Sequence, residues 1–102
     1  LSARVDGMDR AQMRNLADAF RNKWSTAVIV LASGEEGSVS IVSAVTKDIT
    51  SKVHAGKLAG SVAQAVGGKG GGRPDLAEAG GKDPSALPAA LDAVYSSVEG
   101  ML

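Results

Sequence analysis

The apolar residues near the start of the chain follow a strand pattern and then a helix pattern. Residues 2–6 predict a short strand that ends at Gly7. Asp9 begins a helix, and Gln12 three places later gives the spacing of a capping box. Apolar side chains then recur at intervals of three and four and predict one core-facing stripe: Met13, Leu16, Ala17, Phe20 and Trp24.

Two strands are predicted next. Residues 26–32 form a continuous apolar run rich in valine and isoleucine, which is too short for a free-standing helix and typical of a strand buried on both faces. Residues 34–37 place two glutamates between two glycines and predict a hairpin turn. Residues 38–46 predict the second strand, in which Val42 and Val45 break the alternation of apolar and serine side chains and indicate a β-bulge.

A second helix follows the polar connector of residues 47–51, in which Thr50 or Ser51 is available as its cap. Its core-facing stripe consists of Leu58, Val62 and Val66, together with Ala55, Ala59 and Ala65. Gly67 and Gly68 are expected to end this helix, because glycine is the usual residue just past a helix C-terminus.

The last part of the chain predicts one more strand and one more helix. Residues 76–79 suit a short strand, and Asp83-Pro84-Ser85 opens the final helix. The buried stripe of that helix is Leu87, Leu91, Val94, Tyr95, Val98 and Leu102. The predicted order is therefore β-α-β-β-α-β-α, an α/β (α+β) fold with a small mixed sheet of about four strands packed against helices.

Composition narrows the classes of protein to consider. A chain of 102 residues with 44% apolar residues fits one small folded domain, residues 1–102. Cysteine is absent, so disulfides and thiol chemistry are excluded. The three aromatic residues give poor support for base stacking. No apolar run has the length of a membrane span, and the start on Leu1 suggests a piece of a longer protein.

The charges balance overall but not locally. The formal net charge is zero, whereas residues 47–82 carry six cations against three acids. The six cations are Lys47, Lys52, Lys57, Lys69, Arg73 and Lys82. A local field of this sign attracts phosphates, although it is too weak to imply tight nucleic-acid binding by itself.

Residues 67–81 hold seven of the thirteen glycines of the chain, together with Lys69 and Arg73. Such density is costly in backbone entropy unless bare backbone is needed, for example beside an anionic sugar-phosphate chain. The run does not leave a strand to open a helix, which argues against a dinucleotide-binding loop, and Lys69 lacks the following Ser or Thr of a Walker loop. A flexible linker and a backbone-binding loop both remain open.

Nothing in the sequence assembles a catalytic or metal site. His54 is the single histidine, and no partners occur at metal-ligand spacing. A Ser-His-Asp arrangement is not supported either. Asp75 and Glu78 lie three residues apart, which alone is a weak signal for acid–base chemistry. We therefore expect no catalytic residues and no metal ligands in this chain.

Residues 66–91 closely resemble the end of bacterial alanyl-tRNA synthetases, through the string VGGKGGGRPDLAEAGGKDPSALPAAL. The upstream string VIVLASGEEGSVSIVSAVTKDITSKVHAGKLAGSVAQ is similar to the same family, so the likeness covers essentially the whole chain. The matching part of that family is its C-terminal DHH-associated domain, which DHH phosphoesterases share. Those phosphoesterases typically have histidine after their glycines. This chain has Arg73-Pro74-Asp75 there, which favours the synthetase branch.

The resemblance implies a parent enzyme, an alanine–tRNA ligase, that uses ATP and magnesium to join alanine to its tRNA. It implies a separate editing domain with zinc ligands, which clears mischarged serine or glycine. These sites would lie upstream, so this chain is expected to hold no cofactor. The resemblance also implies cytoplasmic location and contact with the outer corner of tRNA(Ala). The helical segment that usually precedes this domain is missing or cut short, which leaves a homodimer open.

We therefore expect an RNA-binding appendage of the synthetase chain, without catalysis of its own and without a membrane partner. Glycine N–H groups would lie against the sugar-phosphate backbone, and lysine and arginine side chains would contact phosphates. The expected RNA-binding residues are Gly67, Gly68, Lys69, Gly70, Gly71, Gly72 and Arg73, with Lys47, Lys52 and Lys57 as outer contacts. Two alternatives remain: a dimerisation or domain-bridging module without RNA contact, and the accessory domain of a phosphoesterase.

Overall fold

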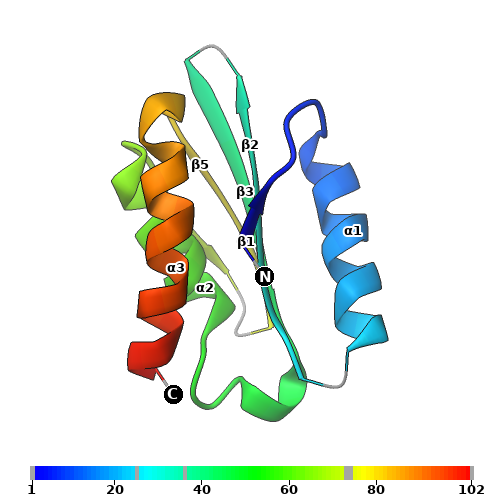
Figure 1. The fold of residues 1–102 in the computed structure, drawn as a ribbon. Coiled ribbons are helices and arrows are strands. Elements are labelled where there is room, and N and C mark those ends of the chain that lie inside the picture. The colour runs from blue at the N-terminus through cyan, green and yellow to red at the C-terminus, as the bar shows by residue number, and fades with distance from the viewer. Residues whose placement is uncertain (1, 25, 36, 73–74, 102) are drawn as a thin grey trace.

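The computed structural model describes residues 2–24, 26–35, 37–72 and 75–101. A five-stranded sheet has one helix on one face and two helices on the other (Figure 1). The strands are β1 (Ser2–Arg4), β2 (Val28–Glu35), β3 (Ser38–Val45), β4 (Lys69–Gly72) and β5 (Leu76–Gly81). The helices are α1 (Arg10–Lys23), α2 (Ala55–Ala65) and α3 (Leu87–Met101), with short 3-10 turns η1 (Lys47–Ile49) and η2 (Pro84–Ala86). The predicted fold class is confirmed, with one more strand than expected.

The strand order is β1-β2-β3-β5-β4, in which β1 pairs parallel to β2 and the other pairs are antiparallel. The β2–β3 ladder runs without interruption from Val28 opposite Val45 to Glu35 opposite Ser38. The predicted bulge is therefore wrong. Alternation is lost because β3 is buried on both faces: Val42 faces the core under α1, and Val45 faces the core under α2 and α3.

Two separate cores hold the three layers together. Under α1, the buried residues are Met13, Ala17, Ile29, Leu31, Val42 and Ala44. On the other face, α2 and α3 pack on the sheet through a larger cluster that includes Val30, Ile41, Leu58, Val62, Leu87 and Leu91. Because α1 packs over β2 and β3, only its long side chains extend toward β5, and this arrangement shapes the surface described below.

The helix ends follow from local hydrogen bonds. The Asp9 carboxylate accepts from the Gln12 N–H at 2.8 Å and the Gln12 side chain accepts from the Asp9 N–H at 2.9 Å, which confirms the capping box. Helix α2 is capped by His54, whose Nδ1 accepts from the Lys57 N–H at 3.2 Å. Neither Thr50 nor Ser51 fills that role, because α2 begins only at Ala55, and Thr50 instead follows the last residue of η1.

Replacing Asp9 with alanine is expected to lower the free energy of unfolding by about 1 kcal/mol, because the Gln12 N–H loses its partner at the start of α1. Chemical denaturation monitored by circular dichroism measures the change. Asp92→Ala, an exposed substitution on α3, is the matched control and should change stability by less than about 0.5 kcal/mol. Equal effects of the two substitutions would contradict the cap.

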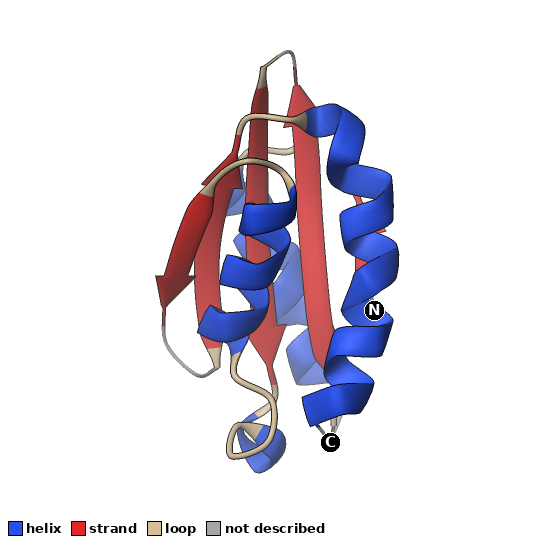
Figure 2. Ribbon diagram, turned by 90° about the vertical axis from the view of Figure 1, so that its left-hand side faces the viewer, coloured by secondary structure: helices blue, strands red, loops and turns tan. Residues whose placement is uncertain are grey.

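Within the glycine run, residues 69–72 form β4, an edge strand, where we expected a linker or a loop (Figure 2). It pairs with β5 from Lys69 opposite Gly80 to Gly72 opposite Ala77. Helix α2 lies directly over it, and a Cβ added to its residue Gly56 would come within 2.6 Å of the Gly72 carbonyl oxygen. These glycines therefore have a packing role, since they let a helix and two strands approach more closely than side chains permit.

Candidate functional site

A cavity of about 490 Å³ lies at the end of the sheet where β5 ends and β4 begins. We call it the basic groove, after its three cations Arg10, Lys69 and Lys82. The rest of its described lining is Ser38, Val39 and Ser40 from β3, with Gly67, Gly68, Gly80 and Gly81. These lining residues include no carboxylate, so the local potential favours an anion.

The sheet register explains how the cations converge. Lys69 pairs with Gly80, and Gly80 pairs with Ser40, so all three lie on the face of the sheet that carries α1. Arg10 extends from the first turn of α1 to the same place, where its Nη2 donates to the Ala79 carbonyl at 3.2 Å. One N–H of its guanidinium is thus used for positioning, and other N–H groups remain for a ligand.

Some backbone N–H groups of the glycine run already donate hydrogen bonds within the protein. The Gly67 N–H donates to the Gln64 carbonyl at 3.2 Å, and the Gly68 N–H donates to the Ala63 carbonyl at 2.8 Å. Gly67 adopts φ +74°, which confirms that it ends α2. On β4, every second residue directs its N–H away from β5, as on any edge strand. A ligand would therefore meet mainly side chains here, with fewer glycine amides than the sequence suggested.

The remaining predicted contacts do not line this groove. Arg73 lies outside the described residues. Lys47 follows the far end of β3, and the five steps along the strand from Ser40 to Val45 already span about 17 Å. Lys52 follows η1, and Lys57 is exposed on α2, which covers the opposite face of the sheet. Their roles in binding RNA stay predictions.

Sequence reasoning did not place Arg10 or Lys82 in the site. Lys82 belongs to the local surplus of positive charge, and that surplus could have indicated its place in the site. Arg10 gave none, because it is far from the glycine run in sequence and only the packing of α1 on the sheet brings it to β5.

A second cavity, of about 440 Å³, lies at the other end of α1. Its lining is Arg21, Asn22, Trp24, Thr46, Lys47 and Asp48. Trp24 is 39% exposed, so its predicted place in the core-facing stripe of α1 is wrong. The chain becomes extended (φ −104°, ψ 137°) at Trp24, where α1 ends. The Thr26 and Thr46 hydroxyls donate to Asp48 and hold the pKa of that carboxyl below its usual range.

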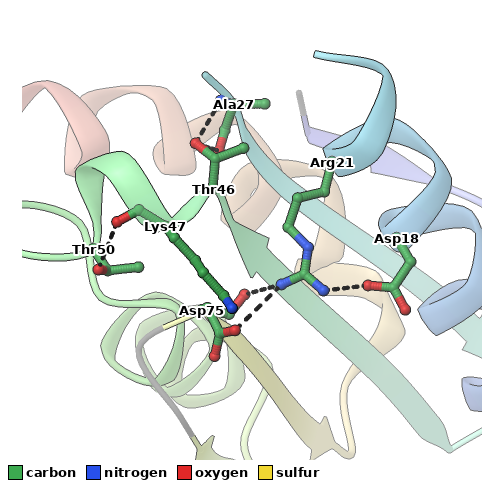
Figure 3. Close-up of polar contacts among 7 residues, drawn as sticks. All are labelled: Asp18, Arg21, Ala27, Thr46, Lys47, Thr50 and Asp75. Atoms are coloured by element: carbon green, nitrogen blue, oxygen red, sulfur yellow. Dashed lines mark hydrogen bonds and ion pairs between the residues drawn. The ribbon is translucent and has the colours of Figure 1, made fainter. Parts of the chain in front are cut away.

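Arg21 forms one wall of this second cavity and is fixed by two carboxylates (Figure 3). It pairs with Asp18 on α1, and its Nη1 lies 2.9 Å from the Asp75 carbonyl and 3.7 Å from the Asp75 carboxylate. Glu78 pairs separately with Arg14 at 3.1 Å. Asp75 and Glu78 therefore engage different arginines, which does not favour a shared acid–base role.

No group of three or more His, Asp or Glu side chains is placed to hold a metal ion within residues 2–24, 26–35, 37–72 and 75–101. Over the same residues, no helix is long and apolar enough to cross a membrane.

Comparison with known proteins gives a consistent picture. Residues 1–100 match the model of the DHHA1 domain. The whole chain is 72% identical to part of an alanine–tRNA ligase from Solibacter usitatus and 51% identical to part of one from Thiobacillus denitrificans, and spans 12% of the length of each. The C-Ala domain from Aquifex aeolicus alanyl-tRNA synthetase has a similar crystal structure, with a TM-score of 0.89 and 33% identity over 96% of this chain and 88% of that chain. The chain belongs to the DHHA1 domain family, as its resemblance to the synthetases indicates.

Proposed function

We propose that this chain is the tRNA-binding C-terminal domain of an alanine–tRNA ligase, and that the basic groove holds the tRNA backbone. One observation carries the proposal: Arg10, Lys69 and Lys82 converge on one cavity whose described lining has no carboxylate. Its volume of about 490 Å³ is within the usual range for ligand sites. The relatives named as alanine–tRNA ligases support tRNA as the polyanion.

The three cations suit phosphates for different reasons. The planar guanidinium of Arg10 offers paired N–H donors, whereas Lys69 and Lys82 act as mobile point charges. Gly80 and Gly81 keep the floor of the groove free of side chains. Such contacts fix the position of an RNA without reading its bases, so recognition would depend mainly on the shape of the tRNA.

For the parent protein we propose ATP-dependent ligation of alanine to tRNA(Ala) in the cytoplasm. Its magnesium, zinc and catalytic residues would belong to other parts of the chain, and residues 1–102 would contribute binding alone. The shared identity with alanine–tRNA ligases over the full length of this chain supports the assignment.

Fluorescence anisotropy with labelled tRNA(Ala), at several salt concentrations, tests the groove. If three cations neutralise phosphates, the plot of log affinity against log salt should have a slope of about −2 to −3. Binding should persist with other tRNAs, because backbone contacts carry no sequence information. Absence of binding at low salt, or affinity independent of salt, would contradict the proposal.

A dimerisation or domain-bridging module stays the second proposal. Among the described residues, the large hydrophobic side chains that are exposed are Trp24 and Tyr95. Tyr95 lies on α3 and is 53% exposed, so its predicted place in the buried stripe of that helix is wrong. Leu87, Leu91 and Val94 of the same stripe do face the core. Light scattering of the chain without RNA separates the two proposals, since a dimer would appear at twice the monomer mass.

A further inference from the structure

The second cavity, at the C-terminal end of α1, combines an aromatic side chain with hydrogen-bonding groups. We propose that it binds an unpaired nucleobase of RNA, stacked on the indole of Trp24. The inference rests on the proposed function, because it assumes that RNA is the partner, but it concerns a site that shares no residue with the basic groove.

The indole ring of Trp24 is held in place by its neighbour on α1. Its ring stacks on Phe20 with centroids 5.1 Å apart and an interplanar angle of 11°. Phe20 in turn packs against the core under α1, so the indole has a firm support. Phe20 stacks on one face of the indole, and 39% of Trp24 remains exposed. A flat, supported and half-open ring is what base stacking requires.

The polar groups around Trp24 match the edge of a base. Asn22 offers both a donor and an acceptor, Lys47 offers donors, and Asp48 offers acceptors. Asp48 is positioned by the Thr26 hydroxyl, which donates to its Oδ2 at 2.5 Å. A purely phosphate-binding site would not need an ionised carboxylate in its lining, whereas the amino groups of bases are good partners for one.

The location agrees with a single RNA partner for both cavities. The groove receives Arg10 from the start of α1, and the second cavity receives Arg21 and Asn22 from its end. The 14 residues of α1 separate the two by about 21 Å. At about 3.4 Å per nucleotide along a stacked strand, this distance corresponds to about six nucleotides. One RNA segment along α1 can therefore place its backbone in the groove and one base on Trp24.

The chain has one tryptophan, so its tryptophan emission, excited selectively over that of Tyr95, reports on this cavity alone. We expect tRNA(Ala) to quench Trp24 emission along the same binding curve that anisotropy of labelled tRNA gives. A fully paired RNA duplex, which has no free base except at its ends, should bind through the groove with little quenching.

Substitutions provide the second measurement. Trp24→Ala should weaken tRNA binding about tenfold or more by anisotropy, and Trp24→Phe should recover most of that loss, because a smaller ring still stacks. Tyr95→Ala is the matched control: it removes an exposed aromatic side chain from α3, on the other face of the sheet, and should bind as the unmodified chain does. Thermal melting of each variant separates lost stacking from lost folding.

The outcomes distinguish this inference from the proposed function. Quenching together with a tenfold loss in Trp24→Ala supports the base site. Full tRNA binding by anisotropy without quenching, or with Trp24→Ala binding as tightly as Tyr95→Ala, overturns the base site and leaves the groove intact. Absence of any tRNA binding overturns both.

Discussion

Gly68→Ala is expected to lower the free energy of unfolding by about 3 kcal/mol, which for a domain of this size corresponds to a loss of about 10–20 °C in melting temperature. A Cβ at this position would lie 1.9 Å from the Gly80 carbonyl oxygen and 2.5 Å from the Gly81 Cα. Both atoms belong to the backbone of β5, which is paired on both sides, so neither can move away cheaply.

The control is Gly100→Ala, on the last turn of α3, where an added Cβ meets nothing within 4 Å. There alanine should be neutral or stabilise the chain by up to about 1 kcal/mol, because glycine weakens a helix. Thermal and urea denaturation of the two variants gives the comparison. If Gly68→Ala were as stable as Gly100→Ala, the close approach of Gly68 to the backbone of β5 would be wrong.

The same substitution separates two explanations of the glycine run. If glycine is present at Gly68 to admit a ligand, alanine should reduce RNA affinity and leave stability unchanged. If glycine is present for packing, alanine should lower the free energy of unfolding. The structure favours packing at Gly68, Gly70 and Gly72, where an added Cβ would come within 3 Å of β5. Glycine density by itself is therefore a poor indicator of phosphate binding in this fold.

Local signals in the sequence predicted the parts of the fold that local interactions decide. The capping box at Asp9 and Gln12 depends on residues three apart, and the left-handed Gly67 ends α2 for reasons internal to its own turn. Strand β4 could not be predicted in this way, because four residues of the pattern KGGG have no intrinsic strand preference. It forms because β5 offers a ladder and α2 offers small residues above it.

In the candidate site, too, local sequence predicted some residues, and tertiary packing alone places others. Lys69 was predicted because it lies inside the glycine run, whereas Arg10 reaches the groove only after α1 packs over β2 and β3. Trp24 was assigned to the core because its spacing continues the stripe of α1. The helix ends one residue before it, and the ring becomes exposed. A one-residue difference at a helix end is beyond what periodicity can resolve.

The combined variant Arg10→Gln, Lys69→Gln, Lys82→Gln is expected to weaken tRNA binding roughly 100-fold at low salt, since it removes three charge-assisted contacts. The slope of log affinity against log salt should also become less negative, by about 2 to 3. Anisotropy over a range of salt concentrations measures both. Thermal melting is measured in parallel, because Arg10 also donates to the Ala79 carbonyl.

The matched control is Lys23→Gln, Lys52→Gln, Lys57→Gln, which removes the same three charges from exposed positions that line neither cavity. If the basic groove binds the backbone, this control should lose only the weak, screened attraction of distant charges, and its salt slope should change by less than about 1. If both variants lost affinity equally, net charge would explain binding and the groove would have no special role. The predicted contacts Lys52 and Lys57 could then account for the loss in the control, because the control removes both.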